Sequence, residues 1–205
     1  MKGKALEMSV LDLLGGAVHK RLPAVASGHA QHESIPQMIE EAVGWLSGGL
    51  RGIKIGFGKR GNARLGYEHD RDVEYVRQMR EAIGADRMLM IDLGWAIKWD
   101  VPTAVRRAVA FEDYRIDWLE GAPRTLGTPR GYRNLRAKTT IGIAYGEKEW
   151  VATRLRAGCW ATETVDVVGV RSGACGEASA GSSEWPNELK HAAARSTPMP
   201  GRLRS

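Results

Sequence analysis

Met88-Leu-Met-Ile-Asp92, Ile116-Asp-Trp-Leu-Glu120 and Ile141-Gly-Ile-Ala-Tyr-Gly-Glu147 are three apolar runs that each end in a carboxylate. The acids lie 28 and then 27 residues apart. That interval fits a strand, a crossover helix and the next parallel strand, because a βαβ unit needs roughly 30 residues. The three runs therefore predict neighbouring strands of one parallel sheet.

The acids that end these runs form a candidate metal site. Carboxyl ends of parallel strands meet at one edge of the sheet, where α/β folds place their chemistry. Alternation along each strand puts Asp92 on the face of Met88 and Met90, Glu120 on that of Ile116 and Trp118, and Glu147 on that of Ile143 and Tyr145. One acid after a strand is usually a helix cap. Three on the inner face of a barrel would be costly without a cation, so we expect Asp92, Glu120 and Glu147 to bind Mg²⁺, or Mn²⁺ in its place.

The sequence on either side of these runs continues the alternation of strands and helices. Further strands are expected over residues 22–27, 52–57 and 165–170, and helices over 6–14, 72–83, 102–111, 131–135 and 150–157. Another helix should begin after Ser34 with a capping box to Gln37, burying Met38, Ile39, Ala42, Val43 and Leu46. Six strand units in strict alternation predict an α/β fold, an incomplete (β/α) barrel of the TIM type. We divide the chain into a helix and linker (1–22), the partial barrel (23–170) and an irregular tail (171–205).

Lys54 lies on the strand before Asp92 with inward-facing parity. It either extends past the strand end to solvent, or its ammonium faces the metal pocket. In the pocket it would bind an anionic substrate or exchange a proton. Parity alone leaves both interpretations open.

Composition narrows the classes of function. Of 205 residues, 43% are hydrophobic and 26% charged, which is ordinary for a globular protein. The net charge of +6 comes from scattered Lys and Arg, so we expect no nucleic-acid partner. Two cysteines without metal spacing, no long apolar run and a poor signal peptide indicate a cytoplasmic protein without a membrane partner.

A glycine-rich stretch offers another interpretation. Gly56-Phe-Gly58-Lys-Arg-Gly61 matches the G-x-G-x-x-G dinucleotide fingerprint after a strand. No helix is expected at its third glycine, and no strand-end acid follows about 20 residues on. A nucleotide-binding protein is therefore the weakest of the alternatives.

The motifs resemble those of the enolase superfamily, in particular its mandelate racemase-like branch. The matching features are Lys54 on the second strand, Asp92 after Met-Leu-Met-Ile, Trp118-Leu-Glu120-Gly-Ala-Pro123 and Ile143-Ala-Tyr-Gly-Glu147. The family forms of the last two are close to W-[IL]-E-E-P and I-A-x-G-E. The resemblance covers roughly residues 5–170.

The resemblance implies a Mg²⁺-dependent enzyme that enolises a small carboxylate, often an acid sugar. A base takes the α-proton, and the metal stabilises the anion that forms. Loss of a β-hydroxyl as water or racemisation follows, and we expect a dehydratase rather than a racemase. Lys54 is the expected catalytic residue, and Asp92, Glu120 and Glu147 are the expected metal ligands.

The chain also departs from the family pattern. Gly56 replaces the second Lys of Lys-x-Lys, Gly94 replaces the usual Asn, and Gly121 replaces the second Glu of W-L-E-E-P. The last strands and the capping domain are expected to be missing, since a full barrel needs about 250 residues. We therefore expect an impaired enzyme. The alternative is a non-catalytic truncated remnant that folds partly or with a partner, and open sheet edges favour a homo-oligomer.

Overall fold

Six parallel strands form a single sheet in the computed structural model, which describes residues 2–17, 19–58, 63–121, 129–147 and 164–168. Their order in the sheet follows their order in the chain. Each described strand pairs with the next: β1 (Ala26–Gly28), β2 (Gly52–Phe57), β3 (Met88–Leu93), β4 (Trp118–Glu120), β5 (Gly142–Tyr145) and β6 (Val167–Val168).

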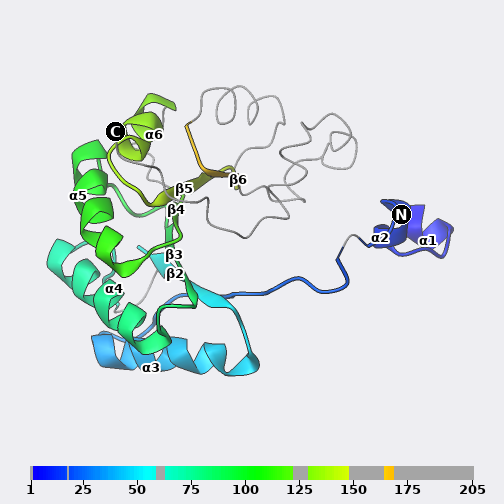
Figure 1. Cartoon of the computed structure of the whole chain (residues 1–205), viewed down its shortest axis with the longest axis horizontal. Coiled ribbons are helices and arrows are strands. Elements are labelled where there is room, and N and C mark those ends of the chain that lie inside the picture. Colours follow the sequence, from blue (N-terminus) through cyan, green and yellow to red (C-terminus); the bar gives the residue numbers. More distant parts are fainter. Residues whose placement is uncertain (1, 18, 59–62, 122–128, 148–163, 169–205) are drawn as a thin grey trace.

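Four helices cover one face of this sheet (Figure 1). They are α3 (Ile35–Trp45), α4 (His69–Ile83), α5 (Val101–Phe111) and α6 (Pro129–Arg136), with short 3-10 turns η1 (Leu46–Gly48) and η2 (Glu112–Tyr114) after α3 and α5. In the described chain β1 and β6 each pair with one strand only, so the described sheet does not close into a barrel. The predicted incomplete (β/α) barrel is confirmed.

The main core lies between the sheet and these helices. Ile55, Ile91, Leu119 and Ile143 are in register across four strands and are almost fully buried. Phe57 extends this layer, with its ring centroid 6.1 Å from that of Tyr75 on α4 and 6.4 Å from that of Phe111 on α5. Every second strand residue therefore packs against a helix, as period-two alternation requires.

The opposite face of the sheet carries the residues of chemical interest. Lys54, Met90, Trp118 and Gly142 form one row across it, and the next row holds Gly56, Asp92, Glu120 and Ala144. Met90 and Ala144 are buried but lie outside the main core cluster. This face is therefore separate from the helix-packed core.

Two aspartates extend the strand ladder at its amino end. The carboxylate of Asp117 accepts the Leu89 N–H at 2.7 Å, and that of Asp166 accepts the Ile143 N–H at 3.0 Å. The N–H of each aspartate donates back to the carbonyl of the same partner. Each side chain thus satisfies the amide of the second residue of the preceding strand, which the short strand after it would leave unpaired.

The predicted helix boundaries agree with the structure more closely than the predicted capping contacts do. Pro36 lies in the first turn of α3, but Ser34 makes no side-chain cap bond, so the predicted capping box is wrong. Met38, Ala42 and Leu46 of the predicted buried face are buried, whereas Val43 at the edge of that face is 38% exposed. Helix α4 begins at His69, three residues before the predicted start.

The N-terminal segment differs from the expected single helix over residues 6–14. It forms α1 (Lys2–Ala5) and α2 (Val10–Leu13). The left-handed φ of Glu7, 53°, interrupts the helix, and Ser9 caps α2 by accepting the Asp12 N–H at 3.0 Å. This pair of helices stands apart from the sheet at the end of an extended linker (Figure 1). The linker continues to residue 25, so the strand predicted over 22–27 is shorter and lies later.

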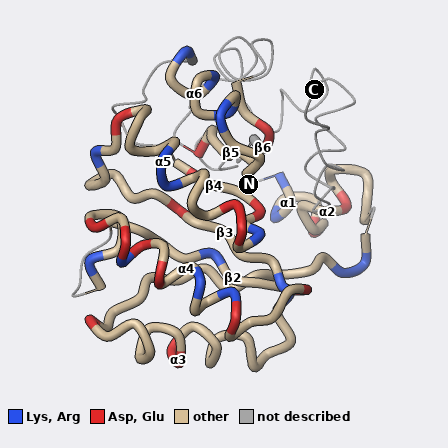
Figure 2. Tube along the Cα trace, turned by 60° about the vertical axis from the view of Figure 1, so that its left-hand side comes forward, with Lys and Arg blue, Asp and Glu red and all other residues tan. Residues whose placement is uncertain are grey.

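Some predictions fall outside the described residues: the helix over 150–157, the last two residues of the strand over 165–170, and the tail over 171–205. Within the described part of that strand, only β6 (Val167–Val168) is extended. Acidic and basic side chains are interspersed along the described helices (Figure 2). No described helix combines the length and apolarity needed to cross a membrane.

Candidate active site

Asp92 and Glu120 are neighbours at the carboxyl edge of the sheet. They are Cα partners in the parallel pairing of β3 with β4, so both side chains leave the same face. Gly121 lies between them, with φ of 67°. A Cβ at this glycine would lie 3.6 Å from Asp92 Oδ1 and 3.1 Å from the Leu93 carbonyl oxygen. The Asp92 carboxylate therefore rests against the backbone that follows Glu120.

Lys54 contacts Glu120 directly. Its Nζ donates to Glu120 Oε2 at 2.6 Å, across the intervening strand β3. The side chains are only 20% and 14% exposed, so both charged groups are largely removed from water. Of the two interpretations of Lys54, the structure supports the ammonium directed toward the carboxylates.

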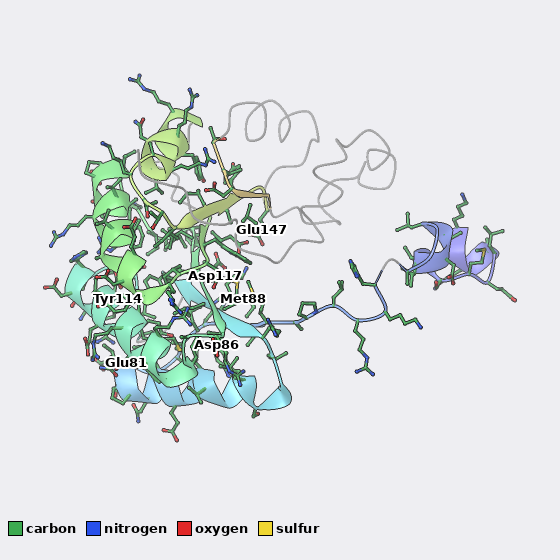
Figure 3. All side chains as sticks on the ribbon, in the orientation of Figure 1. Glu81, Asp86, Met88, Tyr114, Asp117 and Glu147 are labelled. Atoms are coloured by element: carbon green, nitrogen blue, oxygen red, sulfur yellow. The ribbon has the colours of Figure 1, made fainter. Side chains whose placement is uncertain are left out.

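Glu147 lies beyond the end of β5. Figure 3 places it on the side of the strands away from α4 and α5. Strand alternation predicted that Glu147 shares a face with Ile143 and Tyr145, and this grouping is wrong. Ile143 and Tyr145 face the helices, since the Tyr145 ring centroid lies 4.9 Å from that of Tyr132 on α6. Gly146, with φ of 119°, ends the alternation before Glu147.

The donor chemistry of these residues fits a hard divalent cation. Carboxylate oxygens are the ligands that Mg²⁺ prefers, and Asp92 and Glu120 supply them from adjacent strands. Within the described ranges, however, no three His, Cys, Asp or Glu side chains gather closely enough to hold an ion. The sequence thus placed two carboxylates together correctly, and binding by all three stays a prediction.

Glycine stands at three positions where the family pattern has a functional side chain. Gly56 is the register partner of Asp92, so a lysine here would point toward the carboxylates. Gly94 uses its backbone instead, donating its N–H to the Phe57 carbonyl at 2.8 Å. A side chain at Gly121 would be strained by its positive φ and crowded by Leu93. The backbone conformation at position 121 therefore favours glycine over the glutamate of the W-L-E-E-P pattern.

Sequence reasoning missed a buried charged cluster beside the site. Asp72 on α4 is fully buried, and Arg107 on α5 donates Nε to its Oδ2 at 2.9 Å. The Arg107 guanidinium lies 4.6 Å from the centre of the Trp99 ring. Burial raises the pKa of Asp72, while hydrogen bonds from Gly66 and Arg107 oppose the rise. The signal in the sequence was the position of Asp72, which has the helical spacing of buried residues on α4.

Comparisons with known proteins agree with this arrangement. The family described as "Enolase C-terminal domain-like" matches residues 37–199. A D-galactarolactone cycloisomerase of Agrobacterium fabrum is 29% identical over 154 residues, covering 72% of this chain and 37% of that protein. A D-mannonate dehydratase of Caulobacter vibrioides is 28% identical over 170 residues, covering 72% and 41%.

A solved structure supports the same relationship. The 3,6-anhydro-D-galactonate cycloisomerase of Zobellia galactanivorans superimposes with a TM-score of 0.69 at 29% identity, covering 82% of this chain and 44% of that one. The chain spans about two fifths of the length of the curated relatives above. With the family match over most of its residues and six sequential parallel strands in the part that the structure describes, this chain belongs to the enolase superfamily, in its mandelate racemase-like branch.

Proposed function

We propose that this chain carries the metal-binding and proton-transfer edge of an enzyme that removes the α-proton of a small carboxylate. The observation that carries the proposal is the Lys54–Glu120 ion pair beside Asp92, at the edge of the sheet where parallel α/β folds place their chemistry. These residues bring a cationic group and two carboxylates to one face, away from the packed core.

The roles of the residues follow from their chemistry. Asp92, Glu120 and Glu147 would hold Mg²⁺, which would supply positive charge to stabilise the anion left when the α-proton departs. Lys54 Nζ would bind the substrate carboxylate as an ammonium, or take the α-proton as a neutral amine. Because the ammonium is engaged with Glu120, the substrate must compete with that carboxylate or share the ammonium with it.

Among the reaction types of the family, we propose dehydration of an acid sugar. The matched relatives include a D-mannonate dehydratase, which supports this choice, and sugar-derived cycloisomerases, which support the substrate class. Turnover should be slow, because Gly56 leaves Lys54 as the only lysine on the inner face of β2. We further propose that the chain works in the cytoplasm and partners neither nucleic acid nor membrane.

A non-catalytic remnant is the second candidate. Among the residues that the structure describes, no group of three carboxylates is close enough to hold an ion, which favours the remnant. Glycine in place of the second lysine, at position 56, favours it as well. Such a protein would retain the fold without the exchange chemistry.

Solvent exchange of the α-proton tests the proposal. The chain would be incubated in D₂O with D-mannonate and other acid sugars, with Mg²⁺ or with chelator, and the α-proton signal followed by NMR. We expect loss of the signal with Mg²⁺ and none with chelator. Lys54→Met should abolish exchange, since it removes the only amine that faces Glu120 in the described structure.

Metal binding is tested separately by thermal unfolding with Mn²⁺ and with chelator. A ligand at 100 times its Kd stabilises the folded state by about 2.7 kcal/mol, so a raised Tm is expected. Asp92→Asn should remove the shift, whereas Asp86→Asn, at an exposed carboxylate in the turn before β3, should keep it. A shift without exchange would favour the remnant, and equal Tm values would exclude the metal site.

A further inference from the structure

The buried pair Asp72–Arg107 lies where the connections after β2 and β3 meet. Asp72 is in the first turn of α4, which follows β2, and Arg107 is on α5, which follows β3. Their side chains are 0% and 7% exposed, so this contact is shielded from water. The same carboxylate accepts the Gly66 N–H through Oδ1 at 2.6 Å.

Gly66 and Trp99 close this contact into a ring. The Trp99 Nε1–H donates to the Gly66 carbonyl at 2.7 Å, and its indole lies under the Arg107 guanidinium. Gly66 in the β2–α4 connection is thereby held through its N–H by Asp72 and through its carbonyl by Trp99 of the β3–α5 connection. We call residues 63–66 and 94–99 the loop block.

The loop block is joined to the strand ends by backbone contacts. The Gly58 N–H donates to the Leu65 carbonyl at 2.7 Å, and Gly94 donates to Phe57. Gly58 and Gly66 have positive φ, and a Cβ on either would overlap the buried side chain of Ile97. Ile97 therefore fits between two glycines, which fixes the end of β2 against the end of β3.

Stability alone does not account for a charged pair here. Apolar side chains of similar volume often replace a buried ion pair at little cost. A pair in which Asp72 accepts from both Arg107 and Gly66, and in which Arg107 stacks on Trp99, also specifies geometry. The two strands whose carboxyl ends the loop block fixes are β2, which carries Lys54, and β3, which carries Asp92.

We propose that Asp72 and Arg107 are positioning residues, which hold the loop block rigid and thereby set the spacing of Lys54 and Asp92 across β2 and β3. The link to metal binding rests on the proposed function, whereas the rigidity of the loop block does not. A planar guanidinium can donate through Nε and stack on an indole together, which an ammonium does not reproduce.

Arg107→Lys tests the inference because it keeps the positive charge but removes the planar guanidinium. Amide hydrogen exchange would be followed at Gly58, Gly66, Gly94 and Ile97, with the Ile91 amide in the middle of β3 as an internal reference for global stability. We expect exchange in the loop block to rise about tenfold relative to the reference. The Mn²⁺ dissociation constant, measured by electron paramagnetic resonance, should rise about tenfold, as for other outer-shell changes at metal sites.

Two further variants make the outcome decisive. Ile83→Val removes a core methylene at the far end of α4 and should leave both readouts unchanged after normalisation to the reference. Asp72→Asn should behave like Arg107→Lys, and it serves where the latter does not fold.

Exchange that rises equally in the loop block and in β3, or does not rise, would overturn the inference, and so would unchanged Mn²⁺ affinity with a loosened loop block. A parent chain that binds no Mn²⁺ would instead overturn the proposed function, while the exchange measurement would still decide whether the pair fixes the loop block.

Discussion

The Asp117 side chain accepts a hydrogen bond that a strand backbone would otherwise accept. Its carboxylate accepts the N–H of Leu89, the second residue of β3. Burial raises the pKa of this carboxyl, while the Leu89 N–H and the charge of Arg80 oppose the rise. Asp166 repeats the arrangement and is further held by Arg136, whose Nε donates to it at 2.9 Å. Neither role was expected, because the hydrogen-bonding partner lies on another strand.

Asp117→Asn should reveal the raised pKa as a pH dependence of stability. A carboxyl with a higher pKa in the folded chain contributes stability below its unfolded pKa, about 3.9, and loses it as the pH rises through the folded pKa. The amide can still accept the Leu89 N–H but does not titrate. The Tm of the variant relative to the parent should therefore be higher at pH 7 than at pH 3.

The comparison needs thermal scans at both pH values, with Asp86→Asn as the variant of an exposed carboxyl. If the Tm difference between variant and parent stays constant between pH 3 and pH 7, the pKa of Asp117 does not differ between the folded and unfolded chain, which would contradict the prediction.

Helices α3 and α5 begin alike in sequence and differ in how they are capped. Each has a polar residue before a proline-containing first turn, Ser34 and Asp100 respectively. Of these two residues, only Asp100 accepts a cap bond, from the Thr103 N–H at 2.9 Å. Hydrogen bonds from the Thr103 hydroxyl and N–H lower the pKa of Asp100. At Ser34 a capping sequence thus predicted where the helix begins, but the cap bond does not form.

Asp100→Ala should therefore lower the Tm more than Ser34→Ala. The first variant removes an acceptor from the helix amino terminus, whereas the second removes a hydroxyl that makes no cap bond. Because the pKa of Asp100 is lowered, its contribution is present above the unfolded pKa and is lost as the pH falls through the folded pKa. The gap between the two variants should narrow in acid, and equal Tm values at neutral pH would contradict the assignment.

The whole molecule presents two features that favour association. The described sheet is open at β1 and β6, and the segment containing α1 and α2 exposes Leu6, Met8, Val10, Leu11 and Leu14, each 44–69% accessible. Unpaired strand edges and clustered apolar side chains both promote contacts between chains. We therefore expect a homo-oligomer.

Val10→Lys with Leu11→Lys should weaken that association. Sedimentation velocity over a range of concentrations should show a larger species for the parent chain and a shift toward monomer for the variant. Lys2→Glu with Lys4→Glu changes charge in the same segment without removing apolar surface and serves as the matched control. A parent chain that sediments as a monomer at all concentrations would contradict the expectation.

The sequence by itself determined the order of the strands and the adjacency of Asp92 and Glu120. These follow from periodicity and from the spacing of the acids, because alternation is a local property of each strand. Gly56, Gly94 and Gly121 could also be identified as departures without coordinates.

Only the tertiary structure decided which partner each charged group takes. Lys54 meets Glu120 across 66 residues of chain, through the pairing of β2, β3 and β4. Glu147 lies beyond Gly146, where parity no longer applies, and the Asp72–Arg107 pair forms only when α4 and α5 pack together. Periodicity tells which face a residue occupies within a strand, whereas contacts between distant segments depend on strand register and helix packing, which no local pattern contains.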